Sequence, residues 1–163
     1  MRPGKKSDAL PHRFGVVSDT HGLLRGELAQ SLRGVDGIIH AGDVDTPDLL
    51  DRLRGLAPVT AVRGNMDTRG CLARLPETEV MRIGRVWVYV LHDLQRLDLD
   101  AAAGGFQVVI SGHSHRPAQV KKNGVLYLNP GSAGPQRFNL PPSMAILEVT
   151  GSRIRTRFIT LGF

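Results

Sequence analysis

Four short polar signatures, each directly after an apolar stretch, constrain this chain more than any other feature. They are Asp19-Thr20-His21, Gly42-Asp43, Gly64-Asn65 and Gly112-His113-Ser114-His115. Carboxylate, imidazole and amide oxygen atoms are ligands for hard or borderline divalent cations, whereas the thiolate sets of structural zinc sites are absent, since Cys71 is the only cysteine. One carboxylate such as Asp43 can bridge two ions about 3.5–4 Å apart, an arrangement that clamps the oxygens of a phosphoryl group. The sequence therefore predicts a dinuclear metal site for hydrolysis of a phosphate ester.

Length and composition indicate one globular domain. The chain has 163 residues, of which 41% are hydrophobic and 22% charged, enough for one sizeable core. Residues 1–13 contain no apolar stretch typical of a secretory signal, so we expect a flexible N-terminal tail followed by a single domain over 14–163. No segment approaches the roughly 18 apolar residues of a membrane span. A single cysteine excludes an intramolecular disulfide and favours a reducing compartment, which predicts a cytoplasmic protein.

The excess of positive charge is a less specific signal. A formal net charge of +6 and a pI near 10.2 would attract nucleic acid or anionic metabolites without selecting among them. The arginines are scattered, and they lack the interleaved aromatic residues on which single-stranded nucleic acid stacks. We therefore interpret them mainly as a solvated surface and do not favour nucleic acid as a partner.

Apolar runs separated by turn signals predict the order of the elements. In the first half, strands alternate with segments of helical spacing, and strands deliver candidate ligands at their C-terminal ends, where α/β sheets build sites. Hairpins dominate the second half, so we expect an α/β protein with two mixed sheets in layers. The expected strands are 14–18, 35–41, 59–62, 79–83, 86–91, 106–111, 125–128, 144–149 and 154–161. The expected helices are 23–32, 46–56 and 94–103.

The ordered signatures, together with His92 after the fifth apolar run, resemble those of the calcineurin-like metallophosphoesterases. The resemblance extends from residue 14 to about residue 158. The segments Val62–Asp67 and Asn129–Ser132 further resemble the small bacterial and archaeal phosphodiesterase branch of that superfamily. Membership would imply a four-layer sandwich, in which two mixed β-sheets are flanked by helices.

The resemblance also implies a ligand set for two divalent metal ions, bridged by Asp43. The first ion would be held by Asp19, His21, Asp43 and His115. The second would be held by Asp43, Asn65, His92 and His113. Manganese is commonly the most active metal in this branch, with zinc, iron, nickel and cobalt as alternatives.

The expected mechanism follows from charge. Two divalent ions would meet only two anionic side chains, Asp19 and Asp43, so the site would keep positive charge for a phosphate ester. A bridging water would become hydroxide, because metal binding can lower the pKa of water from 15.7 to about 7. We expect this hydroxide to attack phosphorus in line, with the phosphoryl charge stabilised by the ions and Asn65.

Two positions depart from the family pattern. Many larger relatives place a histidine directly after the Gly-Asn pair as an acid for the leaving group, but Met66 stands here. Asp67 is a substitute candidate for this acid, and without one the enzyme should favour leaving groups of low pKa. Asp93 follows His92 where relatives often have glycine, and we interpret it as a residue that orients a ligand or shapes the pocket rim.

Three further residues have weaker signals. Ser132, in the Asn129–Ser132 loop, and Arg137 are candidates for contacting the substrate phosphate, although a turn residue and a solvated arginine are equally ordinary interpretations. His40 lies between apolar residues inside an expected strand, so we interpret it as a buried histidine and not as a ligand.

The leading hypothesis is a metal-dependent phosphodiesterase or phosphatase acting on a small phosphate ester. A nuclease is the nearest alternative, and it would need a continuous basic track to the metals and a steep dependence on salt. A non-catalytic interaction scaffold is the second, because the retromer subunit of this superfamily has lost part of the histidine set. Exposed edge strands are compatible with a homo-oligomer, but the sequence fixes no oligomeric state.

Overall fold

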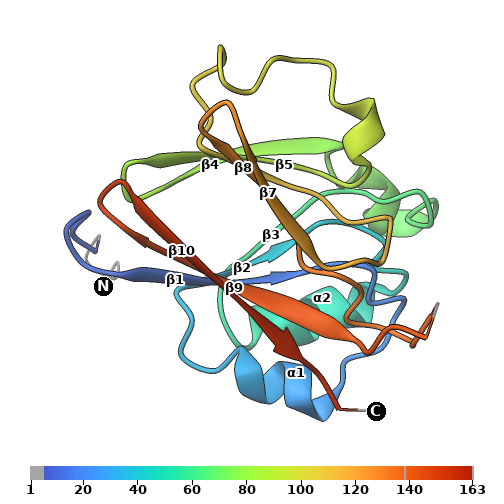
Figure 1. The fold of residues 1–163 in the computed structure, drawn as a ribbon. Coiled ribbons are helices and arrows are strands. Elements are labelled where there is room, and N and C mark those ends of the chain that lie inside the picture. The colour runs from blue at the N-terminus through green and yellow to red at the C-terminus, as the bar shows by residue number, and fades with distance from the viewer. Residues whose placement is uncertain (1–5, 138, 163) are drawn as a thin grey trace.

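Two five-stranded sheets pack face to face in the computed structural model, which describes residues 6–137 and 139–162 (Figure 1). Sheet A has the order β10-β9-β1-β2-β3 and sheet B the order β4-β5-β6-β8-β7. Sheet A comprises β1 (His12–Val17), β2 (Gly37–His40), β3 (Val59–Ala61), β9 (Ser143–Thr150) and β10 (Arg153–Thr160). Sheet B comprises β4 (Thr78–Ile83), β5 (Val86–Leu91), β6 (Val108–Ile110), β7 (Ala118–Lys122) and β8 (Val125–Asn129).

Both sheets are mixed, as the sequence predicts. In sheet A, β1, β2 and β3 are parallel, whereas β9 and β10 are antiparallel additions. In sheet B, β5, β6 and β8 are parallel, and the edge strands β4 and β7 are antiparallel. The parallel strands of each sheet therefore end at a common edge, which is where the polar signatures follow.

Apolar side chains fill the space between the sheets. Alternate residues of β1, β2, β5, β6 and β9 point into this layer, because successive side chains of a strand face opposite sides. The fully buried members include Val16, Ile39, Val88, Ile110 and Leu147. This layer holds the two sheets, and hence the two sets of strand ends, in a fixed relation.

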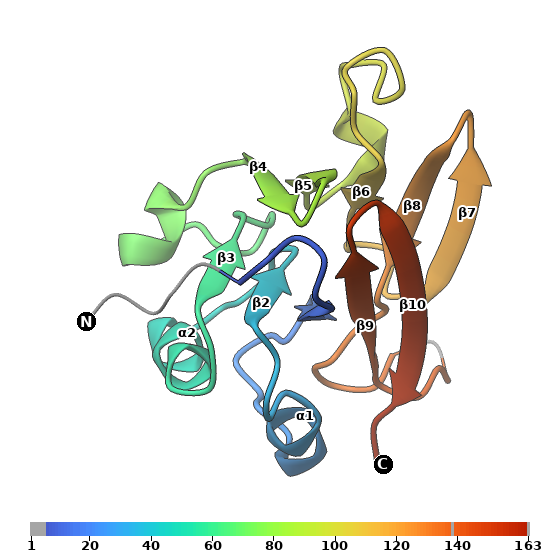
Figure 2. The same ribbon diagram turned by 90° about the vertical axis from the view of Figure 1, so that its left-hand side faces the viewer.

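Two short helices cover the outer face of sheet A (Figure 2). They are α1 (Gly26–Ser31) and α2 (Pro47–Arg54). Pro47 occupies the first turn of α2 after Thr46, as its sequence predicts, and Leu49, Leu50 and Leu53 are buried. In the described part of the chain, no helix is long and apolar enough to cross a membrane.

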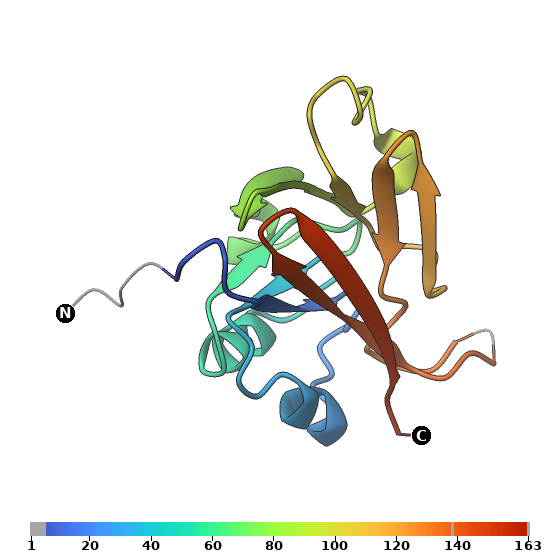
Figure 3. The same ribbon diagram turned by 60° about the vertical axis from the view of Figure 1, so that its left-hand side comes forward.

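The prediction of a helix over 94–103 is wrong. The structure has only the 3₁₀ helix η2 (Leu94–Arg96) and a series of turns, drawn in yellow above sheet B (Figure 3). Asp93 and Asp100 accept the backbone N–H groups of Gln95 and Ala103, so side chains supply bonds that compete with a continuous helix. Ala101 is buried against the outer face of sheet B, so turns, and not a helix, cover that face.

The predicted boundary of the N-terminal tail is also too late. Strand β1 begins at His12, and the segment before it is attached to the sheets. Lys6 Nζ forms an ion pair with Asp36 Oδ2 at 2.9 Å, and Asp8 Oδ2 forms one with Arg82 Nη2 at 2.8 Å. Residues 1–5 lie outside the described residues.

Candidate metal centre

The predicted ligands converge because five parallel strands end at one edge of the sandwich. Asp19 follows β1, Asp43 follows β2 and Asn65 follows β3, all in sheet A. His92 follows β5 and His113 follows β6, both in sheet B. The site is thus assembled from both sheets, and residues almost one hundred positions apart meet in it: the His113 N–H donates to Asp19 Oδ2 at 3.0 Å.

The backbone of this site is unusual. Left-handed φ values between 46° and 71° occur at Asp19, His21, Asp43, Asp45, His113 and His115. Non-glycine residues rarely adopt this region, although Asp and His tolerate it better than most, and each such residue costs roughly 1–3 kcal/mol. A cluster of strained residues in one place indicates a functional site, because only the surrounding structure can hold them there.

Each central carboxylate is held by one oxygen and presents the other to the histidines. Asp19 Oδ2 accepts from Ser18 Oγ at 2.7 Å, while Asp19 Oδ1 lies 3.3 Å from His115 Nε2. Asp43 Oδ1 accepts from the Met66 N–H at 2.8 Å. Asp43 Oδ2 lies 3.4 Å from His92 Nε2 and 4.0 Å from His21 Nε2. Asp43 therefore lies between two histidine groups, where a bridging carboxylate is needed. The first histidine group is His21 and His115, and the second is His92 and His113.

His21 is oriented as a ligand by a residue that the sequence interpretation missed. Its Nδ1 donates to Asp45 Oδ2 at 3.0 Å. Its Nε2 is buried and has no hydrogen-bond partner among the described residues. A carboxylate that holds one ring nitrogen and leaves the other available is the usual support of a metal-binding histidine. Asp45 could have been found from its place two residues after Asp43 in the same polar loop.

The second histidine group has the same design. His92 Nδ1 donates to the Ala41 carbonyl oxygen at 2.7 Å, which directs Nε2 toward Asn65 Oδ1 at 3.0 Å. His113 Nδ1 lies 3.3 Å from both Asn65 Oδ1 and His92 Nε2. His113 Nε2 faces Asp93 Oδ2 at 4.0 Å. Nitrogen and oxygen atoms of three side chains thus lie 3.0–3.3 Å from one another, a separation that suits donors to a common cation.

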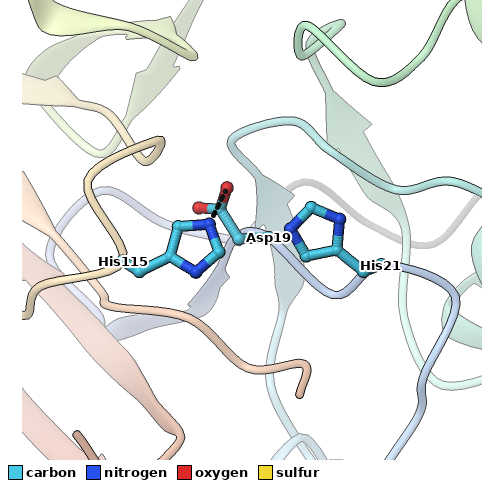
Figure 4. A group of neighbouring side chains, drawn as sticks. All are labelled: Asp19, His21 and His115. Atoms are coloured by element: carbon cyan, nitrogen blue, oxygen red, sulfur yellow. Dashed lines mark ion pairs between the residues drawn. The ribbon is translucent and has the colours of Figure 1, made fainter. Parts of the chain in front are cut away.

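These donors form two overlapping groups whose atoms all lie within 4.8 Å of one another. One is Asp19, His21 and His115, in which the two rings flank the carboxylate (Figure 4). The other is Asp19, Asp43 and His92. The donor set of carboxylate oxygen and imidazole nitrogen fits manganese, iron, zinc, nickel or cobalt. The residues present therefore fit divalent metal ions, and the unpartnered His21 Nε2 is the atom that most requires one.

The protonation of the carboxylates suits this role. Burial opposes the ionisation of Asp19, but hydrogen bonds from His115 and Ser18 outweigh it and hold the pKa of Asp19 below its ordinary value. Burial likewise opposes the ionisation of Asp43, yet His92 and the Met66 N–H hold the pKa of Asp43 below its ordinary value. Both carboxylates are therefore anionic at neutral pH and available to a cation.

His40 is buried and serves the loop that carries Asp43. Its Nδ1 accepts the Gly42 N–H at 3.1 Å, and its Nε2 lies 2.9 Å from Thr20 Oγ1. Complete burial lowers the pKa of His40 to about 4, so the ring is neutral, as its acceptor role requires. This arrangement confirms the interpretation of His40 as a buried histidine.

Asp67, the predicted proton donor, has its carboxylate engaged by backbone N–H groups. Its carboxylate is buried and accepts the backbone N–H groups of Asp43, Val44, Asp45 and Gly64 at 2.9–3.0 Å. Both carboxylate oxygens are therefore engaged as acceptors by the neighbouring backbone. Asp67 instead ties the Asn65 loop to the Asp43 loop.

Neither predicted phosphate contact, Ser132 or Arg137, lines the groove beside the ligands. Ser132 is buried, and its Oγ donates to the Asp19 carbonyl oxygen at 3.0 Å, which supports the ligand loop from behind. Arg137 is exposed and forms an isolated bridge with Leu140. Its side chain does not line the groove beside the ligands.

A groove of about 810 Å³ opens beside Asn65, His92 and His113. Its lining residues come from the 63–78 segment, from β5, from the residues around η2 and from His113. Besides Asn65, His92 and His113, the lining residues are Arg63, Gly64, Asp67, Thr68, Ala73, Pro76, Glu77, Thr78, Tyr89, Leu91, Asp93, Arg96 and Asp98. The groove therefore gives a substrate access to the second histidine group.

The family model for the calcineurin-like phosphoesterase superfamily domain matches residues 13–152, which include every predicted ligand. The chain belongs to the calcineurin-like phosphoesterase superfamily. It is 36% identical over 160 residues to a probable metallophosphoesterase of Methanothermobacter thermautotrophicus, covering 91% of this chain and 92% of that protein. Membership supports a metal-binding hydrolase that acts on phosphate esters.

Solved structures share the fold. An archaeal phosphodiesterase is similar with a TM-score of 0.75 and 22% identity, over 90% of this chain and 99% of that one. Vps29 of Entamoeba histolytica, solved in complex with zinc, is similar with a TM-score of 0.71 and 23% identity, over 91% of this chain and 98% of that one. At these identities the likeness shows the fold alone, which does not separate a phosphodiesterase from Vps29.

Proposed function

We propose that this protein is a dinuclear metal-dependent phosphoesterase that hydrolyses small phosphate esters, with a phosphodiester as the preferred class. The observation that carries the proposal is the position of Asp43 Oδ2 between His21 and His92, at 4.0 and 3.4 Å from their Nε2 atoms. One carboxylate oxygen between two histidine groups is the arrangement that a bridged pair of cations requires.

The ligand assignment is the one that the family resemblance implies, and the two groups of neighbouring donor atoms support it. Asp19, His21, Asp43 and His115 would hold one ion. Asp43, Asn65, His92 and His113 would hold the other, with manganese as our proposed native metal. When bound, the two ions would activate a water molecule as nucleophile and stabilise the charge on the phosphoryl oxygens.

The side chains of this chain define the rest of the chemistry. Asp45 and the Ala41 carbonyl oxygen hold the His21 and His92 rings in place. Asn65 is exposed beside the groove, where its amide group can contact a phosphoryl oxygen. Since Met66 occupies the position of the usual acid and Asp67 is committed to backbone N–H groups, the leaving group would depart without a strong proton donor, which favours leaving groups of low pKa.

A nuclease is the less favoured enzymatic alternative. Arg153 and Arg155 lie on β10 beside Thr150 and Glu148, at the end of sheet A where β1 begins. The ligands follow the opposite end of β1, so these arginines do not lead to the site. The proposed substrates are small esters met in the cytoplasm, the compartment that a single cysteine, Cys71, favours.

Hydrolysis of paired aryl phosphate diester and monoester substrates tests the proposal. The protein is stripped of metal, and manganese, nickel, zinc, cobalt or magnesium is restored separately. We expect turnover that depends on the restored metal, falls by at least about 100-fold in Asp43→Asn and His113→Ala, and persists in His12→Ala, a histidine outside the site.

The possible outcomes separate the candidate functions. Salt-insensitive turnover of the small diester supports the proposal, and preferential cleavage of DNA or RNA with a steep dependence on salt would favour the nuclease. A folded, metal-loaded protein without turnover on any ester would favour an interaction scaffold.

A further inference from the structure

The groove is larger than a phosphate group needs. Its volume of about 810 Å³ is in the range of sites that enclose a whole organic ligand. Asn65, His92 and His113 are among its lining residues, so a phosphate at the metals would leave other lining residues to the rest of the substrate. The remaining lining residues therefore determine which substituents are accepted.

Most charges that line the groove are already committed. Arg63 donates through Nη2 to Glu77 Oε1 at 2.6 Å and through Nη1 to the Ala73 carbonyl oxygen at 2.8 Å. Asp67 accepts only backbone N–H groups. Asp93 Oδ1 accepts the Gln95 N–H at 3.0 Å, while its Oδ2 faces His113.

Arg96 is the exception among the cations of the groove. Its side chain is exposed, and its guanidinium makes no hydrogen bond or ion pair with residues 6–137 and 139–162, whereas the Arg63 guanidinium is paired. It ends η2, four residues after His92, so the two backbones are no more than roughly 10 Å apart. A guanidinium with five unused donors can bind a phosphate or carboxylate with two parallel hydrogen bonds.

We propose that Arg96 binds a second anionic group of the substrate, so that the site prefers phosphodiesters with a further phosphate on the substituent that lies in the groove. The inference rests on the proposed function, since the metals must hold the first phosphate. A nucleoside 3′,5′-bisphosphate, in which a single sugar separates the two phosphates, is a probe for this preference.

Asp98 provides a second test, in which the expected effect on the preference is opposite to that of removing Arg96. It also lines the groove, and its side chain is exposed. Its carboxylate would repel a second phosphate and so limit the preference. Removal of this charge should therefore strengthen the selection that removal of Arg96 abolishes.

Binding to the manganese-loaded protein provides the first readout. Calorimetry compares thymidine 3′,5′-bisphosphate with thymidine 5′-monophosphate. We expect the wild type to bind the bisphosphate at least about 10-fold more tightly, and Arg96→Gln to reduce this ratio below about 2. Arg52→Gln, an equal change of charge on the exposed face of α2, should leave the ratio unchanged, and Asp98→Asn should increase it.

Kinetics provide the second readout. The substrates are the 4-nitrophenyl esters of thymidine 5′-phosphate with a free or a phosphorylated 3′-hydroxyl. We expect the 3′-phosphate to lower KM by about 10-fold in the wild type with little change in kcat, and Arg96→Gln to remove this effect. A KM that is the same for both esters in the wild type, or a preference that survives Arg96→Gln, would overturn the inference.

The two proposals fail in different ways. Selective binding that depends on Arg96, without turnover of either ester, would refute the hydrolase and support the role of Arg96. Metal-dependent turnover with equal binding of both ligands would support the hydrolase and refute the role of Arg96.

Discussion

At the scale of single residues, the two aspartates that flank the ligands have structural roles. Asp45 holds the ring of His21, and Asp67 holds the backbone of the Asp43 loop. Neither needs to touch a substrate to matter, because a ligand that is free to rotate loses affinity for its metal. Their contributions can be separated from catalysis by measuring metal affinity and stability.

Asp45→Asn should weaken metal binding by roughly 10–100-fold, because the amide holds the His21 ring less firmly than the carboxylate does. Competition with a chromophoric chelator measures the affinity, and Asp48→Asn, on the exposed first turn of α2, is the control. An unchanged affinity in Asp45→Asn would show that His21 needs no carboxylate to hold it.

Asp67→Asn should lower the free energy of unfolding by at least about 2 kcal/mol, since one oxygen that accepts buried N–H groups is replaced by an NH₂ group that cannot accept them. Urea denaturation of the metal-free protein measures this loss. A variant of full stability and full metal content that is slow only on esters with poor leaving groups would instead restore Asp67 as the proton donor.

The buried His40 should make the metal-free protein sensitive to acid. Its pKa is about 4 in the folded state, because burial disfavours the charged ring, and the ordinary value is 6.5. Between these values the unfolded chain binds the proton and the folded protein does not. The free energy of unfolding therefore falls as pH falls from 6.5 to 4, by on the order of 3 kcal/mol.

His40→Asn should reduce this dependence on pH, because the asparagine can accept the Gly42 N–H but does not titrate. Urea denaturation at several pH values between 4 and 6.5 measures the slope. His12→Asn, at the start of β1, should keep the wild-type slope. An equal slope in His40→Asn would mean that other groups cause the loss of stability in acid.

At the scale of elements, glycines allow the strand ends to approach one another. A side chain at Gly112 would overlap the Ser18 and Asp19 side chains, and one at Gly64 would overlap Asp43. These positions lie directly before His113 and Asn65, so the loops of both sheets can meet only if no Cβ separates them. The Gly-His and Gly-Asn pairs therefore reflect packing as well as ligand chemistry.

Gly112→Ala should lower the free energy of unfolding by about 1–3 kcal/mol and reduce the metal content, because the added methyl displaces Asp19. Thermal unfolding and elemental analysis measure the two effects. Gly26→Ala is the matched control, since no atom lies within 4 Å of its added methyl group. It should leave metal content unchanged, and equal behaviour of the two variants would contradict the role of Gly112.

At the scale of the whole molecule, the site joins the two sheets. Asp19 and Asp43 belong to sheet A, whereas His92 and His113 belong to sheet B. A cation shared by these residues would connect the layers at their common edge, in addition to the apolar contacts between them. Metal binding should therefore stabilise the folded protein as a whole.

Restoring manganese to the chelator-stripped protein at about 100 times its Kd should raise the melting temperature by roughly 5–10 °C. Differential scanning calorimetry measures the change. His113→Ala should show a smaller increase, because one ligand from sheet B is lost. A melting temperature that does not respond to metal would contradict a site shared between the sheets.

The sequence alone predicts the two mixed sheets, the strands that end at the site, and the order of the ligands. These features are local, because an apolar run followed by a polar pair can be recognised without knowing its neighbours. The prediction of a helix over 94–103 is wrong for the same reason, because it uses only local spacing. Its spacing satisfies a helix, but Asp93 and Asp100 bind nearby N–H groups and Ala101 packs on sheet B.

Only the tertiary structure decides what each polar residue near the site does. Asp67 and Ser132 have the chemistry of catalytic or phosphate-binding residues, yet both are used by the backbone of neighbouring loops. Asp45 gains its role only when the β2 loop lies against His21. Likewise, only the structure shows that the Arg63 guanidinium is paired whereas that of Arg96 is available to a ligand. Residue type sets what a side chain can bind, whereas the partners that folding brings within hydrogen-bond distance decide what it does bind.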